Sequence, residues 1–94
     1  GSLLEDFTLE YYIRHRKEIK AMSSPEALLN TKALLDQFTR EWKTYAPQSG
    51  PLPGEILVFP MARLARYRWG NIGYYQIVNP QDPVIESARI HLSR

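Results

Sequence analysis

The chain has 94 residues, of which 44% are hydrophobic and 23% are charged, and its formal net charge is +2. This length allows one domain with a small core and excludes a second domain. The chain has no cysteine, which excludes disulfides, thiolate nucleophiles and sulfur-ligated metal sites, and no run approaches the roughly 18 apolar residues of a membrane span. The chain begins Gly1-Ser2, which we interpret as a cloning scar.

The first predicted element is a helix over residues 3–22. Its apolar residues recur at intervals of three, four or seven, which is typical of an amphipathic helix. These residues are Leu4, Tyr11, His15, Ile19 and Met22, with Leu3 and Phe7 beside them.

A second helix is predicted over residues 25–46. Ser24 can cap it with Pro25 at the first helical position, or Ser23 and Glu26 can form a capping box. Its apolar stripe consists of Leu28, Leu35, Phe38, Trp42 and Tyr45, with Leu34 adjacent. Because the link between the two helices is short, we expect an antiparallel helical hairpin.

The second half of the chain changes from helical spacing to short runs. Residues 47–54 are rich in Pro and Gly and predict a connector. The runs that follow contain the aromatic and β-branched residues that strands favour. They are Glu55–Phe59, Ala65–Trp69 and Tyr74–Val78, with Gly70–Gly73 as the turn of a hairpin between the last two.

The last segment, residues 84–92, fits two patterns. As a strand it places Val84, Ala88, Ile90 and Leu92 on one face, and as a helix it is capped by Asp82. We favour the strand, because a fourth strand enlarges a small sheet. The predicted fold is therefore α+β: an N-terminal antiparallel helix hairpin packed on one face of a three- to four-stranded antiparallel sheet over residues 55–92.

A group of arginine and aromatic residues forms the candidate binding site. On a strand, Arg66 and Arg68 would share one face, and Tyr67 and Trp69 the other. Guanidinium groups and aromatic rings bind phosphates, bases and acidic surfaces. A plainer interpretation is that the aromatics form the core face of the sheet and the arginines its solvated rim. The candidate residues are Arg63, Arg66, Tyr67, Arg68, Trp69, Tyr74 and Tyr75.

The leading functional hypothesis is a non-enzymatic interaction module, a homodimer or a subunit of a larger assembly, that binds a protein partner through this sheet face. The alternative is an RNA- or DNA-binding module that uses the same face. The only histidines are His15 and His91, and neither belongs to a metal-binding motif. We therefore expect no catalytic residue, no metal and no cofactor. The compartment stays open, with the cytoplasm slightly favoured.

Several segments also resemble the bacterial ParE and RelE toxin family. They are Tyr12-Ile13, Pro25-Glu26-Ala27, the Arg-Tyr-Arg…Gly…Tyr-Tyr pattern and the closing Arg89-Ile-His-Leu-Ser-Arg94. The resemblance implies a helical hairpin under an antiparallel sheet, and an RNA-cleaving or gyrase-directed toxin with an antitoxin partner. In the RNA-cleaving branch it implies that Arg66, Arg68, Tyr75, Arg89 or His91 contacts substrate or takes part in catalysis. The family begins with a β-strand, whereas this chain begins with a predicted helix.

Overall fold

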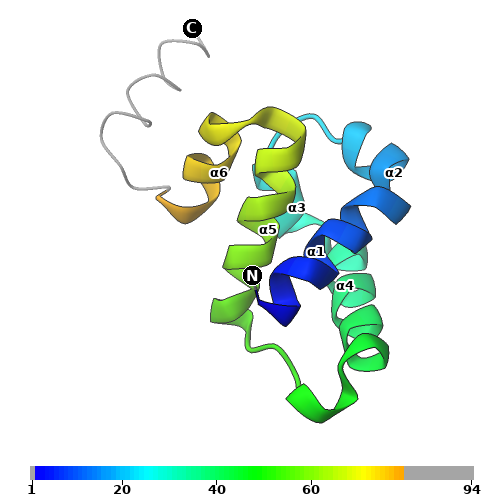
Figure 1. Ribbon diagram of the computed structural model, residues 1–94. Helices are drawn as coiled ribbons and strands as arrows, with labels where there is room; N and C mark the ends of the chain where they lie inside the picture. The colour runs from blue at the N-terminus through cyan, green and yellow to red at the C-terminus, as the bar shows by residue number, and fades with distance from the viewer. Residues whose placement is uncertain (1, 80–94) are drawn as a thin grey trace, which may run out of the picture.

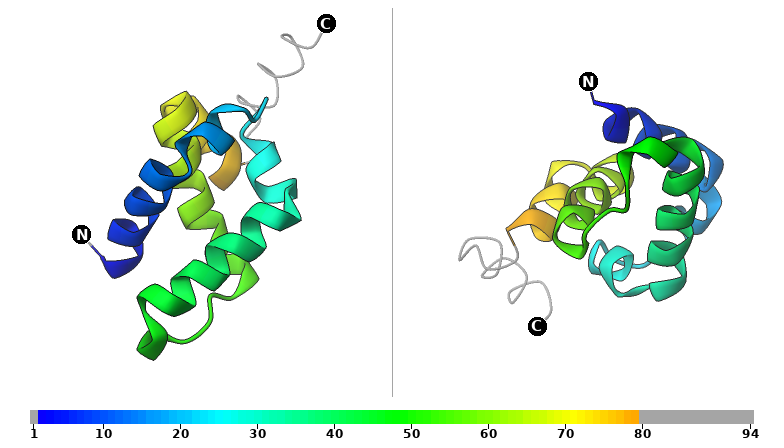
Figure 2. Two further views of the ribbon diagram at one scale, coloured as in Figure 1. Left: turned by 90° about the vertical axis from the view of Figure 1, so that its right-hand side faces the viewer. Right: turned by 90° about the horizontal axis from the view of Figure 1, so that it is seen from below.

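Every regular element in the described part of the chain is helical. The computed structural model describes residues 2–79. Its elements are α1 (Leu3–Arg14), α2 (Arg16–Lys20), α3 (Glu26–Asn30), α4 (Lys32–Tyr45), the 3₁₀ turn η1 (Pro47–Ser49), α5 (Gly54–Trp69) and α6 (Asn71–Val78). Helices α1, α4 and α5 pack around the centre, and α6 lies on the side of α5 that faces away from α1 and α4 (Figures 1 and 2).

Each of the two N-terminal helical segments is interrupted once. His15 separates α1 from α2, and Thr31, in extended conformation, separates α3 from α4. The Thr31 hydroxyl donates a hydrogen bond of 2.6 Å to the Ala27 carbonyl, the same contact that Thr8 and Thr39 make within continuous helices. The serine side-chain caps expected at Ser23 or Ser24 do not form, and α3 begins without a side-chain cap.

The predicted sheet is wrong, and so is the α+β class. Residues 54–69 form the single helix α5, and residues 71–78 form α6, so no strand is present in residues 2–79. Read with helical spacing, Leu57, Met61 and Leu64 form a stripe, and Met61 and Leu64 are fully buried. Burial of this stripe outweighs the preference of aromatic and β-branched residues for strands, which depends strongly on context.

Helix α5 contains a proline at position 60. Pro60 follows the run that we took for a strand, and a proline in a helix interior normally breaks the helix. In the structure α5 continues through it, and the Pro60 ring is buried.

The predicted hairpin turn is instead a corner between two helices. Gly70 has φ 78°, a left-handed conformation that favours glycine, and its N–H donates to the Arg66 carbonyl at 2.8 Å. At Gly73 the two helices touch, because a Cβ there would lie 2.8 Å from both the Ala65 carbonyl oxygen and Trp69 Cβ. The corner therefore folds α6 back onto α5.

Two further expectations concern the sheet and the end of the chain. The antiparallel sheet that the resemblance to the ParE and RelE family implies is absent from residues 2–79. The strand or helix predicted over residues 84–92, and the residues Arg89 and His91, lie outside the described part. No helix in residues 2–79 has the length and apolarity required to cross a membrane.

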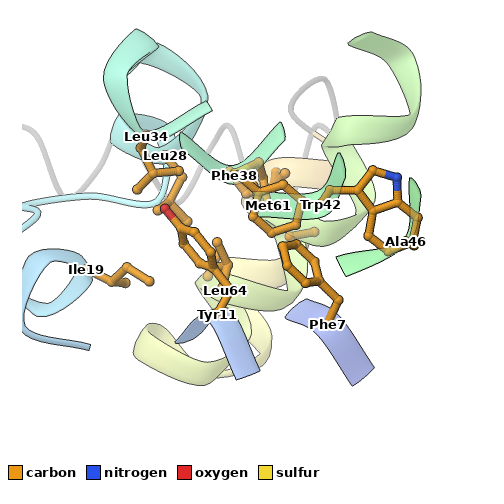
Figure 3. Close-up of a cluster of buried hydrophobic side chains, with 13 residues drawn as sticks. Phe7, Tyr11, Ile19, Leu28, Leu34, Phe38, Trp42, Ala46, Met61 and Leu64 are labelled. Carbon is orange, nitrogen blue, oxygen red and sulfur yellow. The ribbon is translucent and has the colours of Figure 1, made fainter. Parts of the chain in front are cut away.

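The core is built around aromatic rings from α1 and α4 (Figure 3). The Phe7 ring lies 4.9 Å from the Phe38 ring and 5.4 Å from the Trp42 ring, both in edge-on contact. Helix α5 closes the core with Met61 and Leu64. The buried cluster consists of Phe7, Tyr11, Ile19, Leu28, Leu34, Phe38, Trp42, Ala46, Met61, Ala62, Leu64, Ala65 and Ile77.

Tyr11 makes the stability of this core pH-dependent. Its side chain is buried, and its hydroxyl donates to Gln37 Oε1 at 2.9 Å. Burial first, and then the carboxylates of Glu41 and Glu18, raise the pKa of Tyr11, because each disfavours the phenolate.

We expect stability to fall as the pH rises above about 10, the pKa of tyrosine in an unfolded chain. Below that pH the phenol is neutral in both states and its full contribution is present. Y11F should flatten this decline and, by removing the hydrogen bond, cost about 1 kcal/mol at pH 7. Urea unfolding from pH 7 to 11 measures both effects, with Y75F at an exposed tyrosine as the control. An unchanged slope in Y11F would contradict the assignment.

Candidate functional site: the exposed face of helices α1 and α5

The predicted arginine and aromatic residues do not share one face. Residues two apart lie on the same side of a strand, but about 200° apart around a helix. Arg66 and Arg68 therefore point in nearly opposite directions from α5, and the predicted Arg/aromatic sheet face does not exist.

The three arginines have different environments. Arg63 forms an ion pair with Glu5 of α1 at 3.0 Å. Arg68 reaches back to α2, where its Nη2 donates to the Lys20 carbonyl at 3.5 Å, and its guanidinium lies 5.0 Å from the Trp69 ring centre. Arg66 is exposed, and its guanidinium lies 5.9 Å from the ring centre of Tyr74.

The four aromatic residues mostly pack against the fold. The Tyr67 ring lies 5.2 Å from the Tyr12 ring of α1. Trp69 and Tyr74 are partly buried against the core cluster. Tyr75 is exposed on α6, beside Tyr74. Tyr67, Trp69 and Tyr74 therefore pack against the protein, as the plainer interpretation expected of the aromatics, although they do so from helices and not from a sheet.

Two side-chain contacts join α1 to α5 at the surface, along a line that we call the seam. One is the ion pair of Glu5 with Arg63, and the other is the ring contact of Tyr12 with Tyr67. Because both residue numbers increase from the first contact to the second, the two helices run in the same general direction, as Figure 1 shows. These contacts hold the helices together and fix the surface around them.

Large apolar side chains lie exposed on both sides of this seam. On α1, Leu9 is one helical turn from both Glu5 and Tyr12, and Ile13 is one turn further. On α5, Phe59 is one turn before Arg63, and Ile56 precedes it by another turn. The exposed fractions are 45% for Leu9, 53% for Ile13, 37% for Ile56 and 54% for Phe59. We call these four residues the α1/α5 face.

The sequence contained a partial signal for this face. Leu9 and Ile13 are apolar residues off the predicted stripe of the first helix, so an amphipathic helix leaves them in solvent. Ile56 and Phe59 were hidden within a run interpreted as a strand. Only the helical state of α5, together with its position beside α1, places Ile56 and Phe59 before the Glu5–Arg63 contact and Leu9 and Ile13 beyond it along the same seam.

A second polar cluster joins α1 to α4. Arg14 donates to Glu41 Oε1, and His15 Nε2 lies 2.9 Å from Glu41 Oε2. The other ring nitrogen of His15 lies 3.6 Å from Glu18. Both carboxylate oxygens of Glu41 therefore have a side-chain partner. The cluster holds the two helices together.

An open pocket of about 450 Å³ adjoins this cluster. Its lining residues are Phe7, Arg14, Arg40, Glu41, Thr44 and Tyr45. Within residues 2–79, the structure brings no three metal-ligating side chains together.

The comparisons with known proteins identify no relative. No family model matches the chain, and neither a curated protein nor a solved structure matches it.

Proposed function

We propose that this protein is a non-enzymatic interaction module that binds a protein partner through the α1/α5 face. The observation that supports this is the presence of four large exposed apolar side chains on the two helices, with one pair toward each end of the seam between α1 and α5. Isolated exposed apolar residues are normal on protein surfaces, whereas a group of them is typical of an interaction site. Full burial of a Leu, Ile or Phe side chain contributes about 1.5–3 kcal/mol.

The face is also preorganised for binding. Its two helices are joined by the Glu5–Arg63 ion pair and the Tyr12–Tyr67 contact, and both helices are anchored by buried residues, such as Phe7 in α1 and Met61 in α5. A rigid surface loses little conformational entropy when a partner binds.

No observation favours the nucleic-acid alternative in the same way. Phosphate binding needs several free cations on one surface. Arg63 is paired with Glu5, and Arg68 points away from Arg66. We therefore base the proposal on the apolar face and not on the arginines.

Site-specific photocrosslinking in the native cells tests the proposal. A benzophenone amino acid at position 59 should form covalent adducts with protein, because the side chain would lie inside the interface. The same group at the exposed position 43 on α4, outside the face, is the matched control. Equal adduct yields at the two positions, or no adduct at position 59, would overturn the proposal.

A further inference from the structure

The exposed side of α5 carries opposite charges at its two ends. Glu55 lies in the first turn and Arg66 in the last, and both are exposed. They are eleven residues apart, which is about three helical turns or roughly 16 Å, so they point in the same direction. Ile56 and Phe59 lie between them, together with Arg63. Within residues 2–79, neither Glu55 nor Arg66 forms an ion pair.

We infer that the partner is a second copy of this chain, bound through an antiparallel contact between the two α5 helices. This inference rests on the proposed function, because it uses the α5 half of the α1/α5 face. A two-fold axis midway between positions 55 and 66 places Glu55 of each copy beside Arg66 of the other. Phe59 lies within one turn of that axis in both copies, so the two rings meet near the centre.

The charge order favours a second copy in this one orientation. A helix with an acid at one end and a base at the other is complementary to itself when antiparallel. In a parallel pair, like charges would meet at both ends, which is unfavourable. Phe59 lies near the centre and the complementary charges lie at the ends, which matches the usual arrangement of a protein interface, and Arg63 between them is already paired with Glu5 of its own chain.

Another cause could place the same charges there. An acid in the first turn and a base in the last turn also stabilise the isolated helix through its dipole. The two explanations predict different effects when the charges at positions 55 and 66 are exchanged. E55K/R66E restores both pairs across an antiparallel contact, but it opposes the helix dipole at both ends.

Sedimentation velocity on the full chain, over a range of concentrations, tests the inference. The unchanged protein should dimerise. E55K and R66E should each raise the dimer Kd by about tenfold or more, because every single change places like charges together twice across the two-fold axis. E55K/R66E should return the Kd to within about threefold of the original. R40E, the same charge change at an exposed arginine of α4, should leave the Kd unchanged.

Three results would overturn the inference. The first is a monomer at every concentration up to about 1 mM. The second is a dimer Kd that neither E55K nor R66E changes, and the third is a failure of E55K/R66E to restore association. The crosslink at position 59 separates this failure from failure of the proposed function. Adducts with other proteins but none between two copies of the chain would leave the proposed function standing. No adduct of any kind would remove both.

Discussion

Replacing Phe7 with alanine is expected to lower the free energy of unfolding by about 3–5 kcal/mol. The Phe7 side chain is fully buried, and its ring contacts those of Phe38, Trp42 and Tyr45 at 4.9, 5.4 and 5.1 Å. Truncation removes these contacts and leaves a cavity where α1 meets α4. Because small domains are stable by only about 5–15 kcal/mol, this single change would remove a large part of the total.

Phe59 provides a matched control for this prediction. F59A removes the same atoms from a side chain that is 54% exposed, so it should change stability by less than about 1 kcal/mol. The measurement is urea unfolding followed by circular dichroism, in dilute protein so that association adds nothing to stability. Should F7A fail to fold, F7L keeps part of the packing and still allows a measurement. Equal losses in F7A and F59A would contradict the assigned core.

Replacing Gly73 with alanine is expected to destabilise the protein by about 1–3 kcal/mol. The new Cβ would lie 2.8 Å from the Ala65 carbonyl oxygen and 2.8 Å from Trp69 Cβ. The first of these is backbone and the second is fixed to the backbone, so neither moves without a shift of α5. The expected result is a displaced or partly detached α6, seen as a change in Trp69 fluorescence together with the loss of stability.

The control for this change is Gly54, the first residue of α5. No atom lies within 4 Å of the position that a Cβ would occupy there. Alanine is the better helix former, so G54A should leave stability unchanged or raise it by up to about 1 kcal/mol. If G73A were as stable as G54A, the close contact between α5 and α6 would be wrong.

The two halves of the chain differed in how far they could be predicted. In the first half, apolar residues at helical spacing, such as Tyr11, Ile19 and Phe38, indicated helices, and the structure has α1 to α4 there. The interruptions at His15 and Thr31 were not foreseen. At Thr31 the backbone leaves the helical conformation, with φ −95° and ψ 96°, which the apolar spacing does not reveal.

In the second half, short apolar runs allowed two interpretations. The runs Glu55–Phe59 and Ala65–Trp69 have the composition of strands, whereas residues 54–69 read with helical spacing place Leu57, Met61 and Leu64 on one face. The aromatic and β-branched residues of these runs favoured strands, which was wrong. That error gave the wrong grouping for the candidate site residues, because residues two apart share a face of a strand, whereas residues three or four apart share a face of a helix.

Composition and spacing were enough to show that the chain has no thiol and that its first half is amphipathic with helical spacing. Packing was needed to establish that residues 54–69 and 71–78 are helical, that Gly73 touches α5, and that Arg68 points away from Arg66. The physical reason is that a short run gains its conformation from the surface it packs against. The α1/α5 face arises in the same way, because α1 and α5 are far apart in the sequence and only packing joins them along one seam.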